Sequence, residues 1–296
     1  MTYFSSNRLS IEPGIGAPAV RVAGESGPTL CFAANSRFIA TELRPSVALF
    51  YRFATLAGSI ADSRDVSSKE KRRDLERLDA ILTGTSATED SPARHVAAHL
   101  RTDFLARGLP LAHLRHLLQA AQADAANRPC RSWSDLLAYC RYAAAPAGRF
   151  VLDLHGEDRA AWPAAEALCS ALTIVGRIRD CQTEWRVHRR LYIPLDWLTG
   201  AGAHPDDLLA PRCTSALRQA LGQVLDGLDR LHGAAAELPR HIRDRGLRME
   251  AARTLALSRR LAVRLRRGDP IAERIDVSSY DRGFATFTGL SYAWRR

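Results

Sequence analysis

Apolar residues recur at helical spacing along most of this chain, and that regularity constrains its fold more than any other feature. The segments with this pattern are 36–62, 68–83, 91–107, 110–126, 133–155, 162–188, 207–233 and 246–267. The compact β-like runs, RFVLDL at 149–154 and RLYIPL at 190–195, adjoin helical patterns and have no hairpin partners. We therefore predict an all-α fold.

Length and composition indicate one large globular domain. With 296 residues and 46% hydrophobic content, the chain can bury a sizeable core. Residues 1–30 are rich in Gly, Pro and Ser and lack periodicity, which predicts an irregular N-terminal arm followed by a single domain over 31–296. The N-terminus lacks the pattern of a secretory signal, and no stretch is apolar enough to span a membrane. We expect a cytoplasmic protein with reduced cysteines.

The chain is basic, with a formal net charge of +10. Such a charge favours anionic partners, whether phosphates, acidic lipid or nucleic acid. Lys69 and Lys71 are the only lysines in the sequence, so arginine carries almost all of the positive charge. Because no nucleic-acid-binding module is present, we expect no nucleic-acid partner.

An acidic pair, Asp180 and Glu184, is the sharpest local feature. Their spacing of four places both carboxylates on one helix face, after an apolar stretch and among several arginines. A carboxylate pair beside a magnesium ion and a diphosphate would suit these charges. The alternative is an exposed helix face on which the acids pair with the arginines. Asp62 is the last residue of the largely apolar stretch FYRFATLAGSIAD, and it is either a surface acid or a partner of this pair.

Two further segments allow more than one interpretation. Tyr139 precedes the small-residue run Ala143 to Gly148, which either permits close helix packing or leaves room for a bulky apolar ligand. Residues 258–270 alternate arginines with Leu261, Val263 and Leu265. That stretch either lies on an acidic membrane surface or packs its apolar stripe on the core.

Taken together, several motifs in order resemble the squalene/phytoene synthase family, from about Asn35 to Leu290. They are SRFIATELRPSVALFYRFATLAGSIAD, WSDLLAYCRYAAAPAGRFVLDLHG, RDCQTEW with RRLYIPLDWL, and LRRGDPIAERI. The resemblance is strongest to the branch that forms hydroxysqualene in bacterial hopanoid biosynthesis. It implies an isoprenoid synthase fold, with helices around a deep apolar cavity.

The resemblance also implies a reaction and a set of site residues. The reaction is the conversion of presqualene diphosphate and water to hydroxysqualene and pyrophosphate, with Mg²⁺ as cofactor and farnesyl diphosphate as a related substrate. Asp62, Asp180 and Glu184 would bind metal. The remaining site residues implied are Tyr139, Arg190 and Tyr192 for catalysis, and Ser36, Arg37, Tyr51 and Arg179 for substrate binding.

The first acidic motif departs from the family pattern. Thr55, Gly58 and Ser59 stand where relatives have an arginine and a pair of acids, and Thr173 and Gly176 stand where they have glutamine and asparagine. Two hypotheses follow. Either the chain is a divergent enzyme that uses fewer metal ions and shares the charge work with Arg177 and Arg179, or it is a non-catalytic paralogue. Such a paralogue would bind a polyprenyl lipid or partner an active synthase, and peripheral contact with the inner membrane fits both hypotheses.

Overall fold

The computed structural model describes residues 31–85 and 92–293, and in these ranges every regular element is helical. The predicted all-α fold is confirmed. The irregular arm predicted at residues 1–30 lies outside the described residues. None of the described helices is long and apolar enough to cross a membrane.

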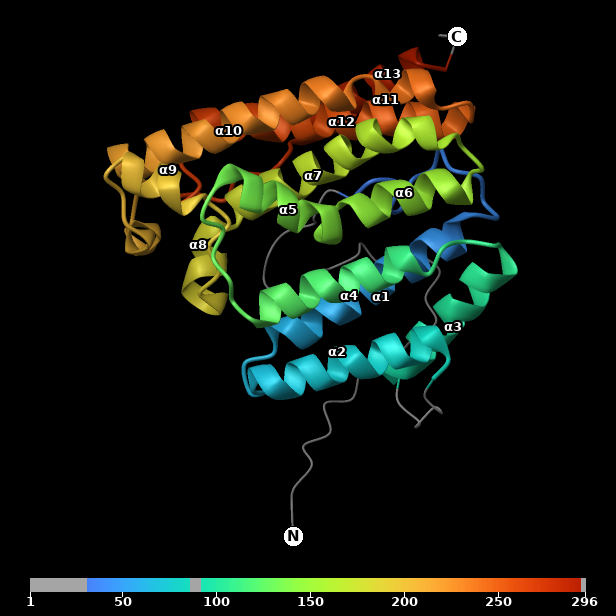
Figure 1. Ribbon diagram of the computed structural model, residues 1–296. Helices are drawn as coiled ribbons and strands as arrows, with labels where there is room; N and C mark the ends of the chain where they lie inside the picture. Colours follow the sequence, from blue (N-terminus) through green and yellow to red (C-terminus); the bar gives the residue numbers. More distant parts are fainter. Residues whose placement is uncertain (1–30, 86–91, 294–296) are drawn as a thin grey trace.

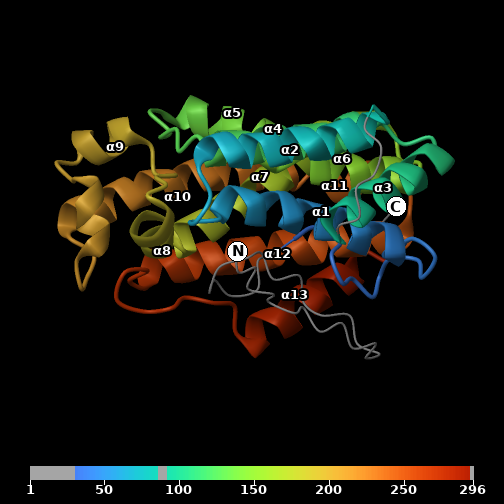
Figure 2. The same ribbon diagram turned by 90° about the horizontal axis from the view of Figure 1, so that it is seen from below.

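The helices stack in layers around α7 (Trp162–Arg179), which lies at the centre of the molecule (Figure 1). It packs against α5 (Trp133–Ala143), α6 (Ala145–Leu154), α10 (Ser215–Ala235) and α12 (Arg245–Arg267). A second group joins α1 (Arg44–Asp62), α2 (Ser68–Thr83), α3 (Pro92–Ala106) and α4 (Ala112–Ala125). Shorter elements connect the long helices: α8 (Cys181–Thr183), α9 (Leu195–Gly200), α11 (Leu238–His241), η1 (Arg159–Ala161), η2 (Glu184–His188) and η3 (Pro205–Leu209). Helix α13 (Ser279–Ser291) lies on the outer side of α12 (Figure 2).

Most predicted helices have the expected positions, and their ends follow ordinary capping chemistry. The segment 68–83 has the predicted bounds, because Ser67 and Glu70 form a capping box and Gly84 ends the helix in a left-handed conformation. Helix α1 begins at Arg44 instead of residue 36, with Pro45 in its first turn. The sequence patterns gave no indication of α13.

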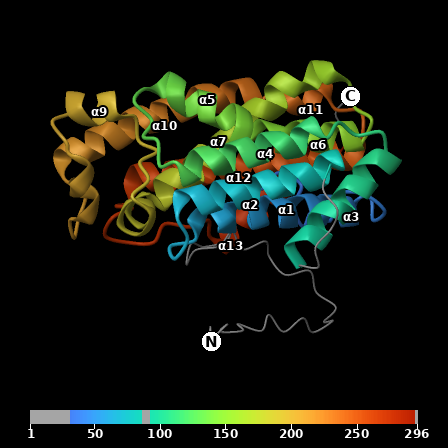
Figure 3. The same ribbon diagram turned by 60° about the horizontal axis from the view of Figure 1, so that its bottom comes forward.

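Two predicted helices are interrupted where the site is built. The segment 133–155 divides at Ala144, because Pro146 has no N–H to donate and its ring excludes a continuous helix. The segment 162–188 leaves regular α geometry at Asp180 (φ −100°, ψ 14°) and continues as α8 and the π-helix η2 (Glu184–His188). Figure 3 shows α9 at one end of the bundle and α3 at the other.

The first described residues, 31–43, are non-helical and are fixed to the bundle by buried hydrogen bonds. The Ser36 hydroxyl donates to Glu250 Oε2 of α12 at 2.7 Å, and the Tyr51 hydroxyl of α1 donates to the Phe32 carbonyl at 2.6 Å. The Phe38 carbonyl lies so close to Gly246 that a Cβ there would be 1.9 Å from it. This segment therefore requires glycine at the start of α12.

We expect Gly246→Ala to lower the free energy of unfolding by about 1–3 kcal/mol, because the added methyl must displace backbone. The matched control is Gly222→Ala in α10, where an added Cβ meets no atom within 4 Å. That variant should gain up to about 1 kcal/mol from helix propensity. Urea unfolding followed by circular dichroism measures both, and equal midpoints for the two variants would contradict the close contact.

Candidate functional site

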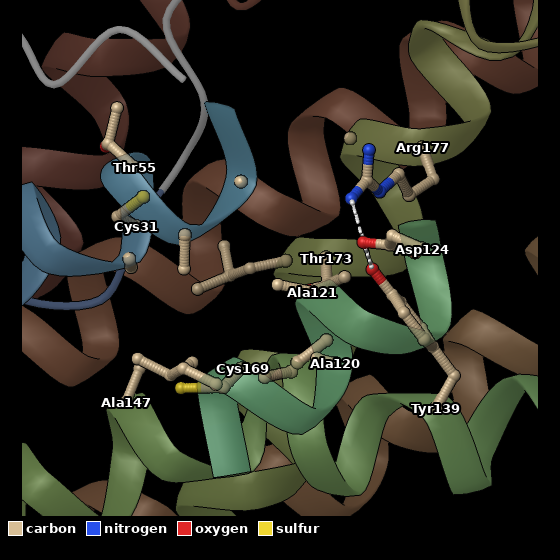
Figure 4. A pocket seen from close by; sticks show the side chains of 18 of the residues that line it. Cys31, Thr55, Ala120, Ala121, Asp124, Tyr139, Ala147, Cys169, Thr173 and Arg177 are labelled. Carbon is tan, nitrogen blue, oxygen red and sulfur yellow. Dashed lines mark hydrogen bonds and ion pairs between the residues drawn. The ribbon is translucent and has the colours of Figure 1, made fainter. Parts of the chain in front are cut away.

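A cavity of about 210 Å³ lies between α1, α4, α5, α6 and α7. Its walls are mostly small or apolar, and Figure 4 shows Cys31, Cys169 and Ala147 away from the polar group of Arg177, Asp124 and Tyr139. The run Ala143 to Gly148 serves both predicted purposes. Ala143, Ala144 and Ala147 line the cavity, whereas Gly148 packs so closely on α7 that a Cβ would lie 3.0 Å from the Ala165 carbonyl.

The cavity brings together the three predicted acids. Asp62 at the end of α1, Asp180 after α7 and Glu184 in η2 all contribute to its wall. Asp62 thus shares a cavity wall with the later acidic pair, and its own ion-pair partner is Arg190. Both earlier interpretations of that pair hold in part, because the acids line a cavity and are also paired with arginines.

Arg177 is the centre of the polar end of the cavity. Its guanidinium forms an ion pair with Glu184, donates to the Tyr139 hydroxyl at 3.1 Å and lies 3.8 Å from Asp124 Oδ2. Its Cζ is 4.4 Å from the centroid of the Tyr192 ring, a cation–π contact. Burial alone would lower the pKa of Arg177, but the surrounding tyrosines and carboxylates outweigh it and raise the pKa, so the charge is permanent.

Asp124, on α4, belongs to this group although the sequence analysis missed it. Its two carboxylate oxygens accept hydrogen bonds from the hydroxyls of Tyr139, at 3.1 Å, and Tyr192, at 2.8 Å. Burial raises the pKa of both tyrosines, which keeps the hydroxyls protonated as donors. A signal was present, because Asp124, like Asp62, is the one acid of its helix and stands near the helix's C-terminal end.

Arg190 joins the ends of two helices beside the cavity. It forms an ion pair with Asp62, and it donates to the Ala61 carbonyl at 3.0 Å and to the Asp124 carbonyl at 3.1 Å. Both carbonyls belong to the C-terminal ends of helices, where the helix dipole favours a cation. Arg190 therefore fixes α1 and α4 relative to each other at the polar end of the cavity.

The other predicted substrate-binding residues differ in position. Tyr51 lines the cavity. Arg179 is buried and holds Asp180 through two hydrogen bonds of 2.9 and 2.7 Å, and it also contacts Asp276 at 3.2 Å. Ser36, Arg37 and Arg179 are not among the described residues that line the cavity. Ser36 instead donates to the buried Glu250.

Two of the replaced motif positions, Gly58 and Gly176, have open space around them. A Cβ at Gly58 or at Gly176 would meet no atom within 4 Å, so no arginine fills the immediate space at Gly58. The Thr55 hydroxyl is buried without a hydrogen-bond partner. The first acidic motif thus leaves room in the cavity where the family pattern places side chains.

The carboxylates do not fit a cluster of magnesium ions. Mg²⁺ in proteins is held by free carboxylates together with phosphate oxygens and waters. Here Asp62, Asp180 and Glu184 each pair with an arginine, and the described ranges contain no group of three acidic, histidine or cysteine side chains placed to hold a metal. One feature does suit a cation, since Glu184 Oε2 is buried without a partner. Magnesium dependence stays a prediction.

The helical layers form an all-α fold that two solved structures share. A dehydrosqualene synthase structure matches with a TM-score of 0.72 and 20% identity, covering 86% of this chain and 88% of that chain. A squalene synthase structure from Alicyclobacillus acidocaldarius matches with a TM-score of 0.66 and 24% identity, covering 78% and 85%. At these identities the likeness shows the fold alone.

Sequence comparison identifies the family. The squalene/phytoene synthase model matches residues 31–281. The hydroxysqualene synthase of Sinorhizobium fredii is 34% identical over 235 residues, covering 79% of each chain, and that of Zymomonas mobilis is 34% identical over 259 residues, covering 87% of this chain and 86% of its own. The chain belongs to the squalene/phytoene synthase family.

We expect Arg177→Met to lower the free energy of unfolding by about 3 kcal/mol, because Glu184 and Asp124 would be left without their shared cation. The double variant Arg177→Met/Glu184→Gln should lose less than the single one. Arg77→Met is the matched control, since its pair with Asp74 is exposed and should contribute less than about 1 kcal/mol. Denaturant unfolding tests all three, and an Arg177→Met loss no larger than that of the control would refute a buried network.

Proposed function

We propose that this cavity binds a polyprenyl diphosphate and that the chain converts presqualene diphosphate and water to hydroxysqualene and pyrophosphate. The observation that carries the proposal is the polar end of the cavity, where Arg177 stands among four acids, next to a wall of small and apolar residues. Arg190 lies outside the lining and pairs with one of these acids, Asp62. The similarity to two hydroxysqualene synthases supports the choice of reaction.

In the proposed mechanism, arginines neutralise the departing pyrophosphate. Carboxylates and phosphates present similar oxygen geometry to a guanidinium, so a diphosphate can replace Glu184 as the partner of Arg177. Positive charge fixed where the leaving group develops negative charge lowers the barrier to breaking its C–O bond. The bond's electron pair leaves with pyrophosphate, and the resulting carbocation takes the oxygen of water, which then loses a proton.

The walls of the cavity protect that carbocation. Tyr139 contributes to the wall, and the ring of Tyr192 packs against the ring of Tyr139. The Tyr192 ring also forms a cation–π contact with the guanidinium of Arg177. Aromatic faces stabilise nearby cations, and apolar surroundings exclude all but a few waters. Asp124 fixes both hydroxyls, so it acts as a positioning residue for the two rings.

A second function is favoured by the open positions at Gly58 and Gly176 and by the arginine pairing of all three acids. In this alternative the chain is a non-catalytic paralogue that binds a polyprenyl lipid or partners an active synthase. Binding would persist while turnover is absent, and Gly58→Asp alone would not create activity.

We place either function in the cytoplasm at the surface of the inner membrane. Polyprenyl substrates and products are largely apolar and partition into bilayers. The cavity chemistry calls for a lipid diphosphate and gives no role to nucleic acid.

Pyrophosphate release from presqualene diphosphate, with product analysis and with farnesyl diphosphate in parallel, decides between the two functions. We expect hydroxysqualene to form, and we expect Asp180→Asn to reduce release at least about 100-fold, because an amide has one acceptor oxygen and cannot keep both of the hydrogen bonds from Arg179 that position residue 180 in the cavity wall. Asp74→Asn, an exposed acid of α2, is the control and should leave the rate unchanged. Lipid binding without release would establish the alternative, and full activity of Asp180→Asn would reject this site.

We expect the affinity for a non-hydrolysable farnesyl thiodiphosphate to change less than about threefold when Mg²⁺ is replaced by EDTA, because guanidinium groups bind phosphate directly. Arg177→Lys should bind more weakly than the parent in both buffers. Isothermal titration calorimetry of the purified chain measures these affinities. Complete loss of binding in EDTA would show that metal, and not fixed arginine charge, holds the diphosphate.

A further inference from the structure

Helix α13 presents a stripe of apolar side chains to solvent. Tyr280, Phe284, Phe287 and Leu290 expose 73%, 42%, 73% and 47% of their surfaces. The three aromatic residues are spaced by four and three, so they lie on one face of the helix. An apolar patch of this kind on a folded domain marks an interaction surface.

The helices that carry this surface expose no carboxylate. Apart from arginines, the only charged residues of α12 and α13 are Glu250 and Asp281. Both acids are buried, where they form ion pairs with Arg253 and Arg264. The outward charge of these two helices is therefore entirely positive.

A groove joins the apolar stripe to this positive charge. It runs between α11, α12 and α13, with Leu255 and Ala256 in its wall and Arg259 and Arg260 beside them. The Cζ of Arg260 is 4.1 Å from the centroid of the Phe284 ring, so the cation and the aromatic stripe form one surface. The other residues that line the groove are Pro239, Ala252, Val263, Phe284, Thr288 and Tyr292.

The segment 258–270 contributes to this surface in a divided way. Leu261 and Leu265 are buried in the core, as one interpretation of the sequence predicted. Val263 is 42% exposed, and Arg260 and Arg267 lie three residues before it and four residues after it on the same face of α12. The other interpretation, contact with an acidic surface, thus applies to the opposite side of the same helix.

We infer that the outer face of α12 and α13 binds the surface of a bilayer that contains anionic phospholipid. Aromatic side chains on an amphipathic helix enter the boundary between head groups and acyl chains. Arginines beside them hold the head-group phosphates, and exposed carboxylates, which would repel those phosphates, are absent from α12 and α13. This surface does not depend on the reaction proposed for the cavity.

Vesicle sedimentation with the full chain tests this surface. Phosphatidylcholine vesicles with phosphatidylglycerol should bind the protein, whereas pure phosphatidylcholine vesicles should bind it weakly. Tyr280→Ser/Phe287→Ser should lower the partition constant at least about tenfold, since burying one large apolar side chain is worth about that factor. Leu105→Ser/Leu209→Ser, at positions 51% and 43% exposed elsewhere on the molecule, is the matched control and should bind like the parent.

A second set of variants tests how much the arginines of this surface contribute to vesicle binding. Arg260→Gln/Arg267→Gln should remove most of the preference for phosphatidylglycerol, and Arg260→Lys/Arg267→Lys should restore it. Equal binding by the α13 variant and the Leu105/Leu209 control would overturn the inference. Absence of vesicle binding by the parent would overturn it too, and light scattering that shows α13-dependent dimers would then assign the face to a second copy of the chain. Pyrophosphate release in detergent, measured on the same variants, keeps failure of the reaction distinct from failure of this surface.

Discussion

The guanidinium of Arg177 is the interaction on which the polar end of the molecule depends. It comes from α7 and is balanced by Glu184 of η2 and Asp124 of α4, with the tyrosines of α5 and of the segment after η2 around it. A charge in so confined a place is stable only when it is paired, so these elements are held in one arrangement. Arg190 completes the arrangement by clamping the ends of α1 and α4.

Much of this architecture follows from local sequence. Helical periodicity and caps placed α2 and most long helices, and the small-residue run marked the place where the chain approaches both a ligand space and α7. Periodicity could not show the break at Ala144 or the change to π geometry after Asp180, because side-chain spacing is nearly continuous across both. Helix α13 was missed although Tyr280, Phe284 and Phe287 recur at helical spacing, and these residues face solvent.

The site residues also divide into those that the sequence predicted and those that only the structure shows. Asp180 and Glu184 were found from their spacing of four, and Asp62 was joined to them by the family resemblance, whereas Asp124 has no such motif and was missed. Which acids meet which arginines is a tertiary property and was not available from spacing. Ser36 illustrates the limit of transferring a role by resemblance, because its hydroxyl is used by a buried glutamate of α12 and fixes the first described segment.

Fixed arginine charge and bound metal differ in one consequence that bears on both proposed functions. A magnesium ion leaves an anionic carboxylate cluster when product departs, whereas a guanidinium remains and is neutralised by the nearest carboxylate. In this chain Glu184 is that carboxylate, and it pairs with Arg177. In the proposed reaction a diphosphate would compete with Glu184 for Arg177, and the return of the same carboxylate would assist release of pyrophosphate. Such competition would weaken binding of the anion but would let the exchange reverse on fixed arginine charge, at a site that has glycine and serine at positions 58 and 59 of its first acidic motif.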